Sequence, residues 1–173
     1  MRLGIVAMFR DEAPYLEEWI LFHRAQGFQR FYLFDDESSD NPESVLRPFI
    51  DEGLVVLSEA PSKPVFKMRQ LASYNLGLEL AKSETDWLAV IDVDEFLFSP
   101  DGALQENLPT EEAIAAVFVW WKMYGSSGNK SPPNEGVIAS YTWSAALPKN
   151  LRETKDVVAK EDQFFGRRGR PIA

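Results

Sequence analysis

Short apolar runs alternate with amphipathic segments along the first half of the chain. Four of these runs are rich in β-branched and aromatic residues, which is typical of strands buried in a parallel sheet. They cover residues 2–9, 31–34, 54–57 and 87–91. Apolar residues at helical spacing occupy the intervening residues 15–26, 42–50 and 66–81. The resulting order, βαβαβαβ, predicts a mostly parallel sheet with right-handed crossovers.

Turn-forming residues mark the expected ends of two of these helices. Pro14 suits the first turn of a helix, where its missing N–H costs nothing. Gly27 is a plausible stop for the same helix. Asn41 followed by Pro42 predicts the cap and the first turn of the next helix.

The pattern weakens in the second half of the chain. Residues 115–123 indicate another strand, and residues 138–143 could form a last one. The intervening residues 125–136 are rich in Gly, Ser, Asn and Pro, and a loop this long is often functional or mobile. From Leu147 onward the chain is polar and basic with little periodicity. We expect one domain over residues 1–173, shortened at its C-terminus.

The composition is that of an ordinary soluble domain with a core. The chain has 173 residues, of which 45% are hydrophobic and 26% charged. No apolar run reaches the roughly 18 residues of a membrane span, and the N-terminus lacks the features of a signal peptide. The absence of Cys excludes disulfides and thiolate metal sites. A cytoplasmic location is the simplest expectation.

The charge narrows the choice of ligands. A net charge of -9 and a pI near 4.7 argue against a nucleic-acid binder, which needs a basic surface. An anionic substrate would need a metal ion or a few local Arg and Lys residues. The single histidine, His23, excludes a metal site made of several histidines. It lies mid-helix in an apolar setting and is interpreted as a packing residue. Any metal would be held by oxygen, which favours Mg²⁺ or Mn²⁺ over Ca²⁺.

Three acidic residues, Asp92, Asp94 and Glu95, interrupt the apolar segment WLAVIDVDEFLF at the end of the fourth strand. Neighbouring carboxylates repel each other and raise each other's pKa unless a cation neutralises them. Open α/β sheets also bind ligands at the carboxyl ends of their strands. Two interpretations follow from the pattern. Asp92 and Asp94 bind a divalent metal together with its ligand, or the acids are simply solvated at a strand end.

Polar clusters also follow the other three strands, and in a parallel sheet they would share one rim with the acids. The clusters are Arg10-Asp11-Glu12 after the first strand, residues 35–40 after the second, and Lys67 with Arg69 beyond the third. Each cluster alone is a weak signal, and their shared position is the stronger one. Ser38 and Asp40 are interpreted as caps of the helix that follows them.

The segments EEWILFHRAQGFQRFYLFDDESSDN and KMRQLASYNLGLELAKSETDWLAVIDVDEFLF resemble glycosyltransferase family 92 (DUF23) and the family-2-like group. The resemblance covers roughly residues 3–100 and continues more weakly through WWKMYGSSG. It implies a GT-A (Rossmann-like) α/β fold, with a mostly parallel sheet flanked by helices. In such a domain the Asp-x-Asp motif binds a metal ion and the diphosphate of a nucleotide sugar.

Carried over onto this sequence, the resemblance makes Asp94 the main ligand of Mn²⁺ or Mg²⁺. Asp92 would share the metal or contact the ribose. Glu95 would be a supporting or structural neighbour. Hard oxygen ligands suit such an ion, which would stabilise the departing nucleoside diphosphate as a Lewis acid.

The same resemblance suggests the nucleotide contacts. Asp36 would hold the base or the ribose. Arg10 and Glu12 lie where family-2-like enzymes place loop contacts to the nucleotide. Arg69 could neutralise phosphate or touch the base, and the alternative is an exposed basic helix start.

The C-terminal part departs from the family pattern, because its later basic or His-containing strand is not recognisable. Glu161 and Asp162 follow the Asp-x-Asp motif at a distance similar to that of the Glu-Asp base of inverting family-2-like enzymes. A carboxylate there would deprotonate the acceptor hydroxyl; otherwise the two acids belong to a polar tail. Arg167, Arg168 and Arg170 are interpreted as part of that tail.

The expected function is a metal-dependent, hexosyltransferase-like enzyme, inverting by family resemblance. It would move a sugar from a UDP- or GDP-linked donor to a saccharide or another hydroxyl acceptor. Trp120 and Trp121 are interpreted as core residues or as the wall of an acceptor pocket. The alternative is a non-catalytic nucleotide-binding remnant or fragment of such an enzyme.

Two further classes are disfavoured. Phosphatases of the haloacid dehalogenase type carry their Asp-x-Asp pair on the first strand, not after the fourth. A calcium loop starting at Asp36 would need Gly and Glu where the chain has Asn41 and Arg47.

Overall fold

The structure is a computed structural model of the 173-residue chain. It describes residues 1–100, 102–111, 113–119, 121–133, 135–144 and 164–167. The chain divides into two compact units. The first comprises Met1–Val117 and Phe164–Ala173, and the second comprises Phe118–Gln163.

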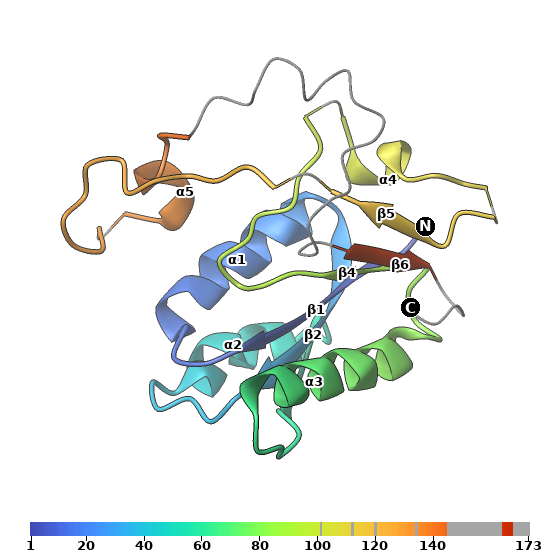
Figure 1. The fold of residues 1–173 in the computed structure, drawn as a ribbon, viewed down its shortest axis with the longest axis horizontal. Coiled ribbons are helices and arrows are strands. Elements are labelled where there is room, and N and C mark those ends of the chain that lie inside the picture. Colours follow the sequence, from blue (N-terminus) through green and yellow to red (C-terminus); the bar gives the residue numbers. More distant parts are fainter. Residues whose placement is uncertain (101, 112, 120, 134, 145–163, 168–173) are drawn as a thin grey trace. The chain divides into compact units, whose positions relative to one another are not determined.

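Within the described residues, six strands form one sheet in the order β3-β2-β1-β4-β6-β5 (Figure 1). Their bounds are Leu3–Phe9 for β1, Phe28–Asp35 for β2, Val55–Glu59 for β3, Trp87–Val90 for β4, Ala116–Phe118 for β5 and Phe164–Arg167 for β6. The first four strands are parallel, whereas β6 runs antiparallel to β4. Phe9 pairs with Asp35, and Asp35 with Glu59. The carboxyl ends of these strands therefore meet along one edge.

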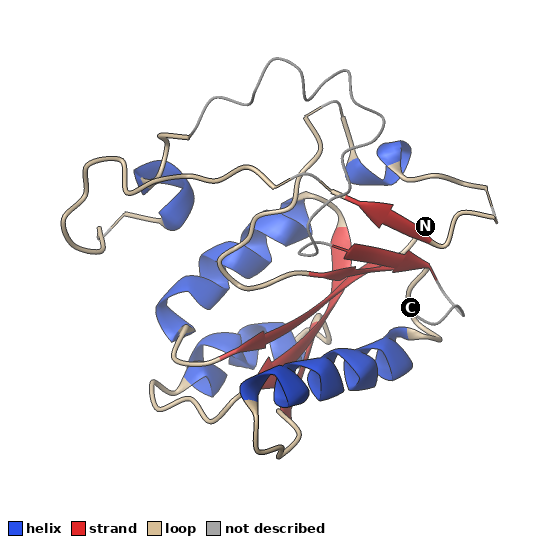
Figure 2. Ribbon diagram, viewed as in Figure 1, coloured by secondary structure: helices blue, strands red, loops and turns tan. Residues whose placement is uncertain are grey.

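Helices cover both faces of this sheet (Figures 1 and 2). The helices that do so are α1 (Ala13–Ala25), α2 (Pro42–Asp51) and α3 (Phe66–Ala81). Two short helices follow along the chain, α4 (Leu104–Asn107) and, in the second unit, α5 (Val137–Ser140). Trp19 of α1 packs against Phe31 of β2, while Ala81 of α3 joins a cluster with the adjacent Tyr32. Because successive side chains of a strand point to opposite faces, α1 and α3 lie on opposite sides. Helix α3 returns the chain from β3 at one edge, past β2 and β1, to β4.

The expected α/β architecture, a mostly parallel sheet flanked by helices, is confirmed. The four N-terminal strands and the three long helices all form, and α3 has the predicted bounds. Strand β2 begins at Phe28, earlier than expected. Gly27, with a φ of 95°, follows α1 as predicted.

Three expectations for the second half are wrong. Residues 138–143 do not form a strand; α5 occupies part of them, closed by the hydrogen bonds Ser140 N–H to Gly136 O and Tyr141 N–H to Val137 O. The strand expected over residues 115–123 is limited to β5. Arg167 is not in an irregular tail, because β6 pairs with β4; Arg168 and Arg170 lie outside the described residues.

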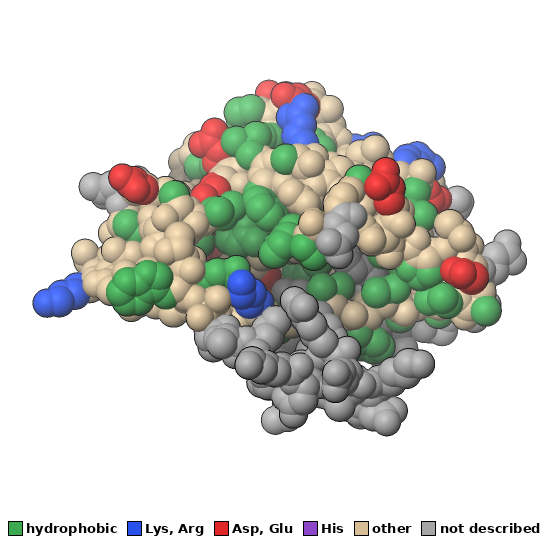
Figure 3. Space-filling view, turned by 90° about the horizontal axis from the view of Figure 1, so that it is seen from above, with side chains coloured by type: hydrophobic (Ala, Val, Ile, Leu, Met, Phe, Trp, Pro, Cys, Tyr) green, Lys and Arg blue, Asp and Glu red, His purple; other side chains and the backbone are tan. Residues whose placement is uncertain are grey.

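Trp121 is not a core residue, since half of its surface is exposed (50%), and Trp120 lies outside the described residues. In the second unit, none of the described residues is buried. Figure 3 shows hydrophobic side chains at the surface of the described residues, among charged ones. No helix in the described ranges is long and apolar enough to cross a membrane.

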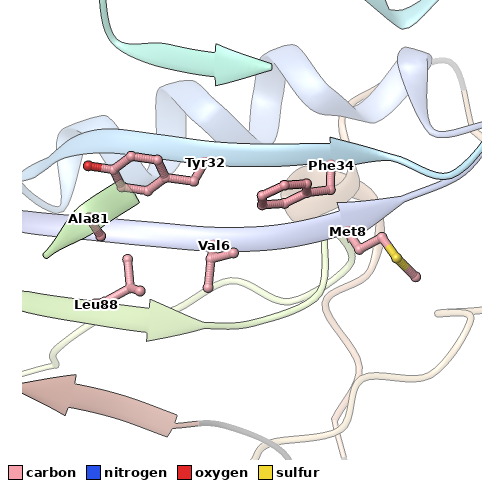
Figure 4. Close-up of a cluster of buried hydrophobic side chains, with 6 residues drawn as sticks. All are labelled: Val6, Met8, Tyr32, Phe34, Ala81 and Leu88. Atoms are coloured by element: carbon pink, nitrogen blue, oxygen red, sulfur yellow. The ribbon is translucent and has the colours of Figure 1, made fainter. Parts of the chain in front are cut away.

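Helix α3 packs on the sheet through small residues. Its buried positions are Ser73, Gly77 and Ala81, spaced four apart on one face of the helix. A Cβ at Gly77 would lie 2.4 Å from Cγ2 of Val6. The helix is therefore as close to β1 as a glycine allows, over the buried cluster of Val6, Met8, Tyr32, Phe34, Ala81 and Leu88 (Figure 4). Several of its larger apolar side chains are exposed, as at Leu71, whereas Tyr74 and Leu78 are partly buried against the cluster.

Helix α1 is tied to the chain that follows β4 by two buried side chains. The indole of Trp19 donates to the carbonyl of Glu95 at 2.8 Å. Nε2 of His23 accepts from the N–H of Leu97 at 3.0 Å, so the proton must be on Nδ1, which donates to the carbonyl of Trp19 at 2.8 Å. His23 is fully buried and stacks on Phe96. Its interpretation as a packing residue is confirmed, and burial lowers its pKa to about 4.

The close approach of α3 leads to a prediction for Gly77→Ala. Alanine is the better helix former by about 1 kcal/mol, but the buried, β-branched Val6 is stiff and cannot move aside. We expect a net loss of about 1–3 kcal/mol in the free energy of unfolding, measured by urea denaturation. The loss should shrink in a Val6→Ala background, which removes the clashing methyl group. A Gly77→Ala variant as stable as the native chain would contradict the packing described.

The buried His23 leads to a prediction for pH. The pKa of His23 is 6.5 in the unfolded chain and about 4 in the folded protein. The unfolded state therefore binds more protons as the pH falls, and the contribution of neutral His23 to stability is lost on acidification. We expect about 2 kcal/mol of that loss between pH 7 and pH 5. His23→Gln, which cannot titrate, should show a correspondingly flatter dependence; equal slopes for the two proteins would contradict this account.

Candidate active site

The loops that follow β1 and β2 are joined by a set of short hydrogen bonds. The N–H of Asp11 donates to the hydroxyl of Ser38 at 2.9 Å. The N–H and hydroxyl of Ser39 both donate to Oδ1 of Asp11, at 2.6 and 3.0 Å. The N–H of Ala13, at the start of α1, donates to Oδ2 of Asp40 at 2.8 Å. The two loops therefore form one connected rim at the carboxyl edge of the sheet.

This network corrects the expected caps. Asp40 caps α1, and Ser38 accepts from the loop before α1; neither was expected to contact that helix. Asn41 precedes α2 as predicted but makes no capping hydrogen bond with its side chain. Its φ of 55° matches those of Asp11 (55°) and Glu37 (63°). Such left-handed conformations are uncommon outside glycine, so the rim is held in an unusual backbone shape.

Asp36 lies at the centre of this rim with only 2% of its side chain exposed. Arg69 of α3 donates to both of its oxygens, from Nε to Oδ1 at 2.6 Å and from Nη2 to Oδ2 at 3.0 Å. Nη2 of Arg10, after β1, lies 3.2 Å from Oδ2. The hydrogen bonds from Arg69 hold the pKa of Asp36 below its usual range. Asp36 is thus a fully ionised carboxylate between two guanidinium groups.

The two arginines differ in their surroundings. Arg69 is 19% exposed, and its Nη1 donates to the carbonyl of Lys63 at 3.2 Å. The ring of Phe66 lies 5.7 Å from its guanidinium carbon. Arg10 is 44% exposed; its Nε donates to the carbonyl of Asp36, and its Nη2 contacts the solvent-exposed carboxylate of Glu37 at 3.2 Å. Arg69 is held on all sides, whereas Arg10 reaches toward solvent.

The Asp-x-Asp motif forms a turn directly after β4. The N–H of Glu95 donates to the carbonyl of Asp92 at 3.1 Å, and the N–H of Asp92 donates to Oε2 of Glu95 at 2.9 Å. Glu95 is buried, so its interpretation as a structural neighbour is confirmed. Oδ1 of Asp92 accepts from the hydroxyl of Tyr74 at 3.0 Å, and that hydroxyl accepts from Gln70 at 2.9 Å.

The two aspartates of the motif have different neighbours. Both are exposed, but Asp92 is bonded to α3 through Tyr74, whereas Asp94 lies near Glu12, before α1. Burial, followed by the charges of Asp94, Asp40 and Asp11, raises the pKa of Glu12. Uncompensated negative charge therefore gathers on the side of the rim where Asp94 lies.

These residues fit a divalent metal that arrives with a phosphate ligand. The described ranges contain no cluster of three or more His, Asp or Glu side chains that could hold an ion by themselves. Mg²⁺ at phosphate-transfer sites is usually held by one or two carboxylates, with water and substrate phosphate completing the shell. An exposed Asp94 beside other carboxylates is suited to that arrangement.

The structure thus separates the predicted site residues into groups. Arg10 and Arg69 both contact Asp36, Glu12 lies near Asp94, and Asp92 is bonded to Tyr74. Glu161 and Asp162 lie outside the described residues. Sequence analysis missed Tyr74. Its spacing of four residues from Gln70, on the helix that leads to the acidic motif, is the signal that could have suggested it.

Curated relatives match most of this chain but are much longer. Glycosyltransferase family 92 proteins of Ricinus communis and Arabidopsis thaliana are each 29% identical to it, over 150 and 160 residues, covering 84% and 85% of the chain. A family 92 protein of Oryza sativa subsp. japonica is 30% identical over 149 residues. The matches cover 27%, 27% and 25% of these relatives, so the chain spans about a quarter of their length.

Solved structures show a remote likeness. Staphylococcus aureus TarS (residues 1–349, in complex with UDP) aligns over 57% of this chain and 29% of its own, with a TM-score of 0.44 and 16% identity. Glucosyl-3-phosphoglycerate synthase of Mycobacterium tuberculosis, in complex with Mn²⁺, UDP and glucosyl-3-phosphoglycerate, aligns over 66% and 42%, with a TM-score of 0.46 and 23% identity. Likenesses this remote assign no ligand to the chain.

The family itself follows from the sequence. The profile of glycosyltransferase family 92 matches residues 6–154. This range contains the connected rim formed by the loops after β1 and β2, Arg69 with its partner Asp36, and the whole Asp-x-Asp turn. Because the match covers most of the chain, the protein belongs to glycosyltransferase family 92.

Proposed function

We propose that this chain is the nucleotide-sugar-binding domain of a GT-A-type glycosyltransferase. It transfers a sugar from a UDP- or GDP-linked donor to a hydroxyl group of a saccharide or another acceptor. Membership of family 92 supports this reaction class. The observation that carries the proposal is the rim at the carboxyl edge of the sheet, where two guanidinium groups and the Asp-x-Asp turn lie at adjoining loop ends. Open α/β sheets bind nucleotides at such edges.

In this proposal Mn²⁺ or Mg²⁺ binds Asp94, with Asp92 sharing the ion or contacting the ribose. When bound, the ion would supply Lewis-acid stabilisation of the departing diphosphate. Asp94 is exposed at the tip of the turn, and Asp92 is oriented by the hydroxyl of Tyr74. Burial and the charge of Asp92 raise the pKa of Tyr74. The hydroxyl is therefore protonated at neutral pH and can donate a hydrogen bond to Asp92.

The remaining rim residues form the nucleotide subsite in this proposal. They are Arg10, Glu12, Asp36 and Arg69, with Asp92 at the border of the metal position. The guanidinium groups offer N–H donors that match phosphate oxygens. Cationic groups at this position are needed because the chain as a whole carries a net charge of -9, which would otherwise repel an anionic donor.

For the acceptor we propose direct displacement with inversion, as the family resemblance implies. Glu161 or Asp162 would accept the proton of the attacking hydroxyl. A domain that binds the nucleotide without turnover is the second candidate, because the later basic or His-containing strand of the family pattern is not recognisable in this sequence. Donor binding without sugar transfer or donor hydrolysis would favour that second candidate.

Replacing Asp94 tests the metal position. We expect Asp94→Asn to weaken Mn²⁺-dependent binding of UDP or GDP by at least about tenfold, because a neutral amide is a poorer ligand for a hard cation. Calorimetry with and without Mn²⁺ measures this. Asp51→Asn is the matched control, since Asp51 is an exposed aspartate at the far end of α2. Equal Mn²⁺-dependent affinity in Asp94→Asn and the native chain would remove Asp94 from the metal site.

Replacing Tyr74 tests the orientation of Asp92. Tyr74→Phe removes only the hydroxyl that donates to this carboxylate. We expect a loss of roughly 10- to 100-fold in Mn²⁺-dependent nucleotide affinity, the range typical of groups that orient metal ligands, with little change in affinity without metal. Tyr32→Phe is the control, because the hydroxyl of Tyr32 bonds to Glu84 and not to the motif. A Tyr74→Phe protein that behaves like the control would contradict this role.

A further inference from the structure

Both carboxylate oxygens of Asp36 are already occupied. Oδ1 accepts from Nε of Arg69 at 2.6 Å, Oδ2 accepts from its Nη2 at 3.0 Å, and Nη2 of Arg10 lies 3.2 Å from Oδ2. Because only 2% of this side chain is exposed, a ligand could reach the buried carboxylate only by separating it from Arg10 or Arg69. Separation of that kind is strongly unfavourable. Direct contact between Asp36 and a base or ribose is therefore a poor fit to this geometry.

The three groups instead form a support for Arg10. Arg69 is fixed by its fork-like pairing with Asp36, by the carbonyl of Lys63 and by the ring of Phe66. Asp36 in turn holds Arg10 at two points, with Oδ2 near Nη2 and its own carbonyl accepting from Nε. Without the negative charge between them, the two guanidinium groups would repel each other.

Arg10 is the member of this group that a ligand can reach. Its side chain is 44% exposed, and among the described residues its Nη1 has no hydrogen-bond partner. Its Nη2 contacts Glu37, whose side chain is 89% exposed. An ion pair so open to water is weak, so an incoming anion can displace Glu37 at little cost.

We infer that Asp36 is a positioning residue, which orients Arg10 to bind a phosphate group of the ligand and does not contact the ligand itself. This inference rests on the proposed function, because it takes the phosphate to be that of a nucleoside diphosphate. A guanidinium edge presents paired N–H donors in the geometry of phosphate oxygens. The role differs from the one that the family resemblance implies for Asp36, which was to hold the base or ribose.

The test compares the affinities of UDP, uridine and inorganic pyrophosphate, each with Mn²⁺, by calorimetry on the full chain. Asp36→Asn and Arg10→Gln should each weaken UDP and pyrophosphate binding by roughly 10- to 100-fold, the range for hydrogen bonds to charged groups, and leave uridine binding unchanged. The double variant should lose no more than Arg10→Gln alone, because Asp36 acts through Arg10. Asp36→Glu, which keeps the charge, should restore part of the loss.

Other results would overturn the inference. Additive losses in the double variant, or weaker uridine binding in Asp36→Asn, would mean that Asp36 contacts the ligand itself. Native affinity for UDP in Arg10→Gln would remove Arg10 from the phosphate position. Should Asp36→Asn fail to fold, Arg10→Lys still tests the inference, because it retains the positive charge and loses the paired N–H donors of the guanidinium group. This variant should bind UDP more weakly and uridine with unchanged affinity.

Two controls separate this inference from the proposed function. Arg47→Gln removes an exposed arginine of α2 whose ion-pair partner within the described part of the chain is Glu43, and this variant should bind UDP like the native chain. If the native chain binds neither UDP nor GDP with or without Mn²⁺, the proposed function fails. If the native chain binds them and Arg10→Gln binds equally well, only the inference fails.

Discussion

A single buried carboxylate joins three separate parts of this fold. Asp36 follows β2, Arg10 follows β1, and Arg69 lies in the first turn of α3, so their ion pairs close the carboxyl edge of the sheet. Removing one partner of a buried pair leaves an uncompensated charge and costs several kcal/mol, whereas the intact pair adds little net stability. The pairing therefore contributes mainly geometry: it fixes where the two guanidinium groups lie before any ligand arrives.

The same edge is held from the other face by helix α1. Trp19 and His23 bond to backbone groups at the end of the acidic turn and just after it, at Glu95 and Leu97. Asp40 in return caps the start of α1. The acidic motif is thus connected to α1 through backbone hydrogen bonds and to α3 through Tyr74. Groups placed on such rigid elements need little reorganisation when they bind a ligand.

Local patterns explain what could be predicted from the sequence. Strands β1 to β4 and helices α1 to α3 each carry their own periodicity, and the acids after β4 stand out because three like charges follow an apolar run. Strand β6 was missed because it depends on pairing with the distant β4. The partners of Asp36 could not be predicted either. Arg10 and Arg69 were each candidate site residues, but no local sequence pattern indicates that both contact the same carboxylate. Tyr74 was missed for the same reason.

The small residues on the inner face of α3 affect how loss-of-function screens of this protein should be interpreted. Gly77 leaves no room for a methyl group against Val6, and Ser73 is fully buried on the same face. The helix that they seat on the sheet also carries Arg69 and Tyr74. A random library scored only for loss of the proposed nucleotide binding would therefore return Gly77 as well as any residue of the proposed site. Folding assays would be needed to distinguish residues that pack α3 on the sheet from residues of the proposed binding site.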